Sequence, residues 1–241
     1  MNSGKILLIA LILFVIGAVI CGIMFAISGF DPEKLSNVKY ETITTDVDES
    51  FKSLSINLST DDLEIIPTED GKCKVVYDES EDSIHNIKVD NDTLTINVEY
   101  KKKFHFIFDA DFKSPKITLY IPKKDYENVN VKSSTGEITI KDLNLKDLTI
   151  DVSTGDVTLS NVIASGAFNL SASTGEITFN ACDATTIKAN ASTGDITGTL
   201  LSGKNFSASS STGDVNVPAS SEGGSCELKT STGDIDIKLA N

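Results

Sequence analysis

The 241-residue sequence contains no tryptophan and no arginine, so all 21 of its basic residues are lysines. Tryptophan offers a large ring for stacking against ligands, and its absence weakens the case for a sugar-stacking platform. β-Solenoid polysaccharide lyases typically use an arginine or lysine base beside an acidic calcium cluster, so the absence of arginine counts against that class of enzyme. Both absences make a carbohydrate-cleaving enzyme a poor fit to this composition.

Histidine is also scarce. His85 and His105 are its only occurrences, and neither has a partner at a spacing that predicts catalysis. Carboxylates are plentiful, yet none forms the isolated pair in uncharged surroundings that glycoside hydrolysis uses. The sequence therefore predicts a protein that is not an enzyme and has no catalytic residue and no cofactor.

Acidic residues outnumber basic residues in the chain as a whole. The sequence has 35 acidic residues against 21 lysines and a formal net charge of -14. A surface of this kind repels nucleic acid and anionic lipid at ordinary salt. We therefore expect no nucleic-acid partner.

What the sequence does contain is a short phrase, Ser-Thr-Gly-acid-Ile/Val, which occurs six times in its C-terminal half. The first copy is Ser134-Thr135-Gly136-Glu137-Ile138, and successive glycines are 19, 20, 19, 19 and 20 residues apart. So regular a period over about 100 residues indicates a repeat architecture whose units bury their apolar faces against their neighbours. The six glycines are Gly136, Gly155, Gly175, Gly194, Gly213 and Gly233.

Apolar residues recur at fixed positions around each glycine. Around Gly155, for example, they are Leu148, Ile150 and Val152 before it and Val157 and Leu159 after it. Spacing by two is the period of a β-strand, and the five-residue step across the phrase breaks that period, so each unit holds two strands joined at a corner. Glycine suits the corner because it adopts positive φ readily. The prediction is an all-β, single-stranded, β-helix-like solenoid with about 19–20 residues per rung.

Two other repeat folds fit the sequence less well. Leucine-rich repeats have a similar period, but their asparagine and helical segments are missing here. A β-propeller needs units of about 40 residues. The regular solenoid is therefore assigned to residues 129–241.

Upstream, residues 51–128 contain strand-like segments separated by turn clusters such as Glu69-Asp70-Gly71. Ser59-Thr60-Asp61-Asp62-Leu63 resembles a corner with aspartate in place of glycine, so we expect irregular rungs that cap the regular solenoid. Residues 31–50 are assigned to a linker and first strand. The alternating rings of Phe104, Phe106 and Phe108 either pack within these rungs or form an exposed aromatic-basic loop that touches membrane or glycan.

One long apolar run, residues 6–27, is long enough to span the hydrocarbon core of a bilayer. A secretory signal has a shorter apolar region, although Ala26-Ile27-Ser28 is a candidate cleavage site. Residues 1–30 are therefore predicted to form a transmembrane anchor with a short cytoplasmic tail. Lys5 before the run and acidic residues after it predict a single-pass protein of the bacterial cell membrane whose C-terminal domain is extracytoplasmic.

The four cysteines, Cys21, Cys73, Cys182 and Cys226, show no metal-ligand spacing. Cys182 and Cys226 occupy inward positions three repeats apart, which corresponds to about 14 Å along a stack of strands. That separation is too large for a disulfide. We expect both to be small buried apolar side chains.

Stacking the repeats places one acidic side chain per rung in a row, which we call the acidic ridge. Carboxylates about 5 Å apart repel by roughly 0.8 kcal/mol even in water, so neutralising contacts are expected. In one interpretation, corner hydroxyls and backbone N–H groups donate to the acids. In the other, the ridge binds Ca²⁺ weakly at many sites, although one carboxylate per rung makes a poor cage. The ridge consists of Glu137, Asp156, Glu176, Asp195, Asp214 and Asp234.

Three features together carry a family resemblance: Ile117-Thr118-Leu119-Tyr120-Ile121-Pro122, then Val129-Asn130-Val131, then the head-to-tail repeats. They resemble the bacterial putative-adhesin domain family of unknown function, which includes LiaG-type membrane-anchored envelope proteins. The resemblance covers the chain from about Leu54 to the C-terminus. It implies a β-solenoid displayed at the cell envelope and supplies no catalytic motif.

The resemblance and the composition lead to one functional expectation. We expect a non-enzymatic, membrane-anchored, extracytoplasmic adhesin, cell-envelope scaffold or stress-response protein, with the membrane, cell-wall glycan or envelope proteins as partners. Two alternatives stay open at this point. One is a polysaccharide-active β-helix enzyme with an acidic cleft, and the other is a regulatory partner of envelope-stress membrane proteins.

Overall fold

The computed structural model of the chain describes residues 13–20, 22–23, 26, 38–101, 114–220 and 222–240. The chain divides into two compact units, residues 1–39 with 103–113 and residues 40–102 with 114–241. All eighteen described strands lie in the second unit. Cys21, His105 and the rings of Phe104, Phe106 and Phe108 lie outside the described residues.

The predicted transmembrane helix is not found. In the first unit, helical residues are described at positions 13–20, 22–23 and 26. No helix within the described part of the chain is long and apolar enough to cross a membrane. The prediction of a single-pass protein of the cell membrane with an anchor in residues 1–30 is therefore wrong for this structure.

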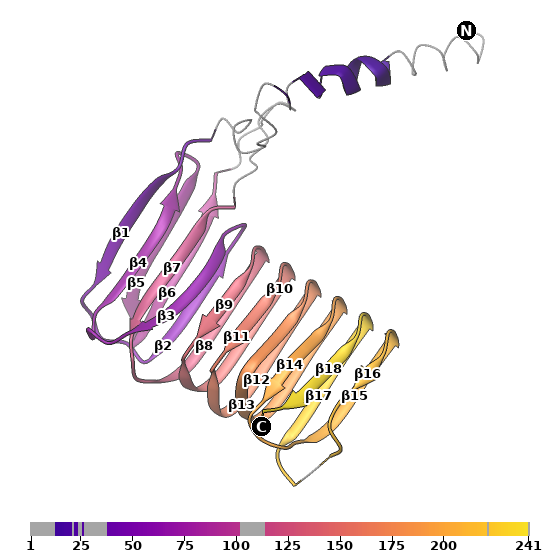
Figure 1. Ribbon diagram of the computed structural model, residues 1–241. Coiled ribbons are helices and arrows are strands. Elements are labelled where there is room, and N and C mark those ends of the chain that lie inside the picture. Colours follow the sequence, from indigo (N-terminus) through magenta and orange to yellow (C-terminus); the bar gives the residue numbers. More distant parts are fainter. Residues whose placement is uncertain are drawn as a thin grey trace, which may run out of the picture. The chain divides into compact units, whose positions relative to one another are not determined.

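The second unit is a β-solenoid in which one chain winds two sheets, so the predicted all-β solenoid is confirmed (Figure 1). Its strands are β1 (Glu41–Val47), β2 (Ser53–Leu58), β3 (Asp62–Thr68), β4 (Cys73–Glu79), β5 (Ser83–Asp90), β6 (Thr93–Tyr100), β7 (Lys116–Pro122), β8 (Asp125–Thr135), β9 (Ile138–Lys141), β10 (Asn144–Thr154), β11 (Val157–Ser160), β12 (Ile163–Thr174), β13 (Ile177–Thr193), β14 (Ile196–Leu200), β15 (Asn205–Thr212), β16 (Val215–Asn216), β17 (Ser225–Thr232) and β18 (Ile235–Leu239).

Each sheet has a defined order of neighbouring strands. The first sheet runs β1–β4–β7–β3–β9–β11–β13–β14–β18–β16. The second runs β5–β6–β2–β8–β10–β12–β13–β17–β15. The long strand β13 takes part in both sheets. Pairing is parallel except for β1–β4, β4–β7 and β5–β6, which lie at the N-terminal end of the stack.

The core lies between the two sheets and follows the apolar positions of the repeat. Ile150 pairs with Val131 on one side and Leu170 on the other, so equivalent residues of successive rungs stack directly. All three are 2% exposed or less. The rings of Phe168 and Phe179 stack inside this core with their centroids 6.4 Å apart. Alternation along each strand therefore buries one continuous apolar column per position.

The order of the rungs in space differs from their order in the sequence at both ends of the stack. At the C-terminal end, Cys226 of β17 pairs with Ile187 of β13 and with Phe206 of β15. The last repeat therefore lies between the two repeats that precede it, as the yellow strands in Figure 1 show. At the other end, β2 and β3 lie between β6–β7 and β8–β9.

This order corrects the predicted placement of two cysteines. Cys182 pairs with Leu200 in the next rung, and the rung that follows it holds Cys226, so the two cysteines are two rungs apart and not three. The prediction failed because it assumed that neighbours in sequence are neighbours in space. Both side chains are free thiols and fully buried. Burial raises the pKa of Cys226 to about 12, as expected of a packed, unreactive thiol.

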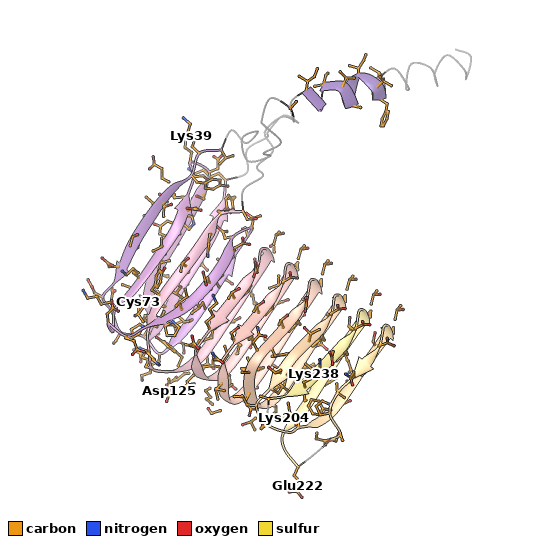
Figure 2. The ribbon with its side chains drawn as sticks, viewed as in Figure 1. Lys39, Cys73, Asp125, Lys204, Glu222 and Lys238 are labelled. Carbon is orange, nitrogen blue, oxygen red and sulfur yellow. The ribbon has the colours of Figure 1, made fainter. Side chains whose placement is uncertain are left out.

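A buried ion pair fixes the connection that skips a rung. Lys204, labelled in Figure 2, precedes β15, and its side chain is only 5% exposed. Its Nζ lies 2.5 Å from Oδ1 of Asp183 in β13 and donates to Oγ of Ser202 at 2.8 Å. Burial raises the pKa of Asp183, but the hydrogen bonds from Lys204 and Ser202 outweigh burial, and the pKa is lowered. The Lys204–Asp183 ion pair thus ties the segment between β14 and β15 to the rung of β13, which is not paired with β15.

Replacing Lys204 with methionine should lower the free energy of unfolding by about 3 kcal/mol, because the Asp183 carboxylate loses its buried cation. The loss should shrink in acid, since a carboxylate with a lowered pKa stabilises above its ordinary pKa of 3.8 and ceases to do so as the pH falls through the lowered value. Urea unfolding at several pH values measures both effects. Lys123→Met, which breaks the exposed Lys123–Glu69 pair, is the control and should change little. Equal losses for the two variants would contradict the structural role of Lys204.

Candidate functional site

The six corners stack so closely that their backbones touch. All six glycines have φ between +129° and +142°. A Cβ atom on any of them would lie 2.0–2.3 Å from the carbonyl oxygen of the corner residue in the preceding rung. Gly155 N–H, for example, donates to Thr174 O at 2.8 Å. No amino acid other than glycine tolerates this backbone conformation together with so small a clearance.

The acidic ridge is held together by its own backbone. The Oδ1 atom of Asp156 accepts from the N–H of Glu176 in the next rung at 2.8 Å. Asp195 accepts from the N–H of Asp234 at 2.7 Å, and Asp234 accepts from that of Asp214 at 2.8 Å. Upstream of the repeats, Asp62 binds the N–H of Glu137 in the same way. Each aspartate with a further rung beyond it therefore bonds to that rung.

The two glutamates of the ridge accept hydrogen bonds from hydroxyl groups, and not from backbone N–H groups as the aspartates do. Glu137 Oε1 accepts from the hydroxyl of Thr139 at 3.3 Å. Glu176 Oε1 accepts from Thr178 at 3.1 Å and from Thr197 in the next rung at 2.7 Å. The donors to the ridge are thus backbone N–H groups of the next rung and threonine hydroxyls of the same or the next rung. The sequence suggested this kind of donor but not these partners.

The ridge order follows the rungs, so Asp234 lies between Asp195 and Asp214. In the residues that the structure describes, no three His, Cys, Asp or Glu side chains come together as a metal site. Five of the six carboxylates, all except that of Asp214, instead bind a protein donor through one oxygen. Charge-assisted hydrogen bonds of this kind reduce the repulsion along the row.

Beside the ridge, the serine and threonine of every corner phrase are exposed. Their backbones belong to the ladder, as in the bond from Thr135 N–H to Ser59 O, while their side chains point outward. Hydroxyls and carboxylates therefore repeat once per rung along one edge of the stack. We call this surface the corner strip; it comprises the acidic ridge together with Ser134, Thr135, Ser153, Thr154, Ser173, Thr174, Ser192, Thr193, Ser231, Thr232, Ser211 and Thr212.

Asp61 takes the place of the glycine in the rung before the first repeat. Its carbonyl oxygen faces Gly136, and its side chain is buried. Oδ1 accepts from the Tyr100 hydroxyl at 3.0 Å, whereas Oδ2 has no hydrogen-bond partner among the described residues. Burial raises the pKa of Asp61, although the bonds from Tyr100 and the backbone oppose the rise. This residue therefore ends the glycine column and does not belong to the exposed strip.

His85 is a packed residue of β5. Its side chain is 1% exposed, its ring stacks on Tyr77 with centroids 4.3 Å apart, and its Nδ1 lies 3.9 Å from Glu79 Oε1. Burial lowers the pKa of His85, and the Glu79 charge opposes that shift. The ring is thus inaccessible to a substrate in this arrangement. The burial of Asp61 and Lys204 could not be recognised from the sequence, because charged residues are normally exposed.

The tight backbone contact at the corners leads to a stability prediction. Gly155→Asn should lower the free energy of unfolding by at least about 3 kcal/mol, since the side chain meets both the unfavourable φ and the carbonyl of Gly136. Gly71→Asn is the matched control: its φ is +70°, which asparagine tolerates, and nothing lies within 4 Å of its added Cβ. Thermal unfolding of the two variants should separate them by at least about 6 degrees in Tm, since 1 kcal/mol corresponds to about 2–4 degrees for a domain of this size. Similar Tm values would show that the corner has room for a side chain.

The hydrogen bonds of the acidic ridge lead to a second stability prediction. Asp195→Ala should cost about 1 kcal/mol, because the N–H of Asp234 loses its acceptor, whereas Asp195→Asn keeps an acceptor oxygen and should cost less. Asp214 belongs to the last rung and receives no N–H from a further one in the described chain, so Asp214→Ala should leave stability unchanged. Chemical denaturation compares the three variants. A loss at Asp214 as large as that at Asp195 would contradict the bonding pattern of the ridge.

A similar fold is found in a solved structure. No curated protein matches the chain. The structure is similar to that of a putative cell adhesion protein from Clostridium sporogenes, with 18% identity and a TM-score of 0.53 over 84% of this chain and 100% of that one. A putative adhesin from Bacteroides fragilis has 20% identity and a TM-score of 0.49, over 82% of this chain and 97% of that one.

The family is identified from the sequence match. The model of the Toastrack DUF4097 family matches residues 51–241, which include all six corners and every described strand except β1. The expected relationship to bacterial putative-adhesin domains is thereby confirmed. On this match, the chain belongs to the Toastrack DUF4097 family.

Proposed function

We propose that this chain is a non-enzymatic, adhesin-like protein that binds an extended polar polymer along the corner strip. The observation that carries the proposal is the in-register repetition of exposed hydroxyls and carboxylates, one set per rung. The Clostridium sporogenes structure with the same fold is named a putative cell adhesion protein, which agrees with a binding role. Cell-wall glycan is the class of polymer that the sequence led us to expect.

The chemistry of the strip favours hydroxyl-rich ligands. Serine and threonine hydroxyls both donate and accept, and the ridge carboxylates accept with charge assistance. Each contact is weak, but a polymer that engages several rungs gains from the high effective concentration of the later contacts. A regular strip therefore binds a repeating ligand better than a small molecule.

The charge of the protein narrows the choice of polymer. A net charge of -14 repels polyanions such as teichoic acids at moderate salt. We therefore propose an uncharged or amine-bearing glycan as the ligand. A role in envelope scaffolding or in a stress response would follow from binding a glycan of the cell wall.

A pull-down of the full chain on chitin, chitosan and an immobilised teichoic acid tests the proposal. Retention is expected on chitin or chitosan and not on teichoic acid. Thr154→Val with Thr174→Val removes two hydroxyls from the strip without changing side-chain shape, and it should weaken binding about tenfold. Thr149→Val with Thr186→Val removes two exposed hydroxyls elsewhere on the second sheet and serves as the control.

Three results would contradict the proposal. An equal loss of binding in the two double variants would show that the polymer does not bind at the corner strip. Preferential retention on teichoic acid would contradict the electrostatic argument. Release of new reducing ends from any of these polymers would show an enzyme.

A further inference from the structure

The C-terminal end of the solenoid differs from the other strand edges that the structure describes. Strand β15 pairs with β17 alone, so its other edge is open. It contains no charged residue and no proline. The edge strands at the N-terminal end, β1 and β5, carry acidic or basic residues. Natural sheets protect open edges with such charges, so an uncharged edge is unusual where no partner is present.

The outward residues of β15 strengthen the contrast with its neighbour. Ser207 and Ser209 lie in register with Glu227 and Lys229 of β17, which form an ion pair with each other. The protecting charges are therefore present one rung inside the stack and absent from the rung at its end. Side chains as small as serine allow another backbone to approach.

The apolar side of the last rung is also left open. Val215 is 43% exposed and Phe206 is half-buried, whereas their partners in the adjacent rung, Ile235 and Cys226, are fully buried. Covering apolar surface contributes about 25 cal/mol per Å². A further strand on this end would therefore gain burial as well as backbone hydrogen bonds.

The free backbone groups of β15 are confined to a short segment. Asn205 N–H donates to Gly224 O at 2.9 Å, so in a parallel pair the alternate residues Phe206, Ala208 and Ser210 direct their N–H and C=O groups to the open edge. Ser220 already covers the first of these: its hydroxyl accepts from Phe206 N–H at 3.1 Å and donates to Phe206 O at 3.4 Å. Ala208 and Ser210 are left for a partner.

We propose that this edge binds a second copy of the chain, with β15 pairing antiparallel to β15 of the partner about a two-fold axis through Ser209. In this register Ala208 of each copy lies opposite Ser210 of the other, and each pair exchanges two hydrogen bonds. The pairing ends before Phe206, where Ser220 occupies the edge. No side chain of β15 carries a charge that meets its own copy.

A second copy fits this edge better than a strand of another protein. A two-fold axis requires a surface that is complementary to itself, and Ala208 and Ser210 provide identical donors and acceptors on both copies. The edge also lacks the charged side chains that would select a different partner. Because the whole chain carries -14, salt should strengthen the dimer by screening the repulsion between copies.

The oligomeric state of the full chain tests the inference. Sedimentation velocity should show a concentration-dependent dimer that is favoured by added salt. Ser209→Lys places two like charges opposite each other across the axis and should weaken the dimer at least tenfold. Ser171→Lys is the matched control, since Ser171 occupies the same exposed position on an interior rung, and it should leave the dimer unchanged.

A cross-link tests the register independently of any effect on folding. In a non-hydrogen-bonded antiparallel pair the two Cα atoms lie about 4.5 Å apart, which is within disulfide range. With Cys21→Ser as background, Ser209→Cys should give a disulfide-linked dimer under mild oxidation, and Ser171→Cys should not. The inference is overturned by a chain that stays monomeric, by a dimer that Ser209→Lys does not weaken, or by equal cross-linking of the two cysteine variants.

Discussion

The contact between the backbones of successive corners is the constraint on which the rest of the structure depends. Each corner carbonyl lies where a Cβ of the next corner would be, so every repeat needs glycine at one position and in one conformation. Once the glycines are in contact, the strands on both sides are in register, and their apolar positions stack into continuous columns. The aspartate that follows the glycine then reaches the next backbone N–H. The main role of the repeated phrase is thus to connect each rung to the next.

The same constraint explains why the ends of the stack are special. A corner can be extended by any unit that presents the same phrase, whatever its place in the sequence. The last repeat shows this, because β17 lies between β13 and β15 of the two preceding repeats. Lys204 and Asp183 hold the connection to β15, which skips a rung. At the N-terminal end Asp61 ends the glycine column, and one rung further on the antiparallel strands end the parallel stack. At the C-terminal end the described chain has no such stop, and the rung of β15 and β16 keeps an open edge.

Much of the architecture was predictable from the sequence because the period is a local property. The glycine spacing gave the corners, and the alternation around Leu148 and Ile150 gave the buried columns. The rung order was not predictable, since Cys226 and Phe206 stand at equivalent positions and either repeat can pair with β13. The apolar run near the N-terminus suggested a spanning helix on hydropathy alone, but none of the described residues form a helix long and apolar enough to cross a membrane.

The candidate site was predictable in its composition but not in its bonding. The sequence placed the six acids in a row, yet whether an acid binds a backbone N–H or a hydroxyl depends on one methylene group. Aspartate reaches the N–H of the next rung, and the longer glutamate reaches Thr178 and Thr197. The burial of Asp61 and Lys204 depends on contacts between segments distant in sequence.

Amide hydrogen exchange at the corner glycines tests the central claim most directly, because the N–H of every corner glycine except that of the last rung donates to the next rung in space. The ladder runs from Gly194 to Thr232 and from Gly233 to Thr212, and it ends at Gly213. Gly233 N–H should therefore exchange slowly, with the protection of the interior corners, and Gly213 N–H should exchange rapidly. Slow exchange at Gly213 together with rapid exchange at Gly233 would show a stack in sequence order and contradict this account.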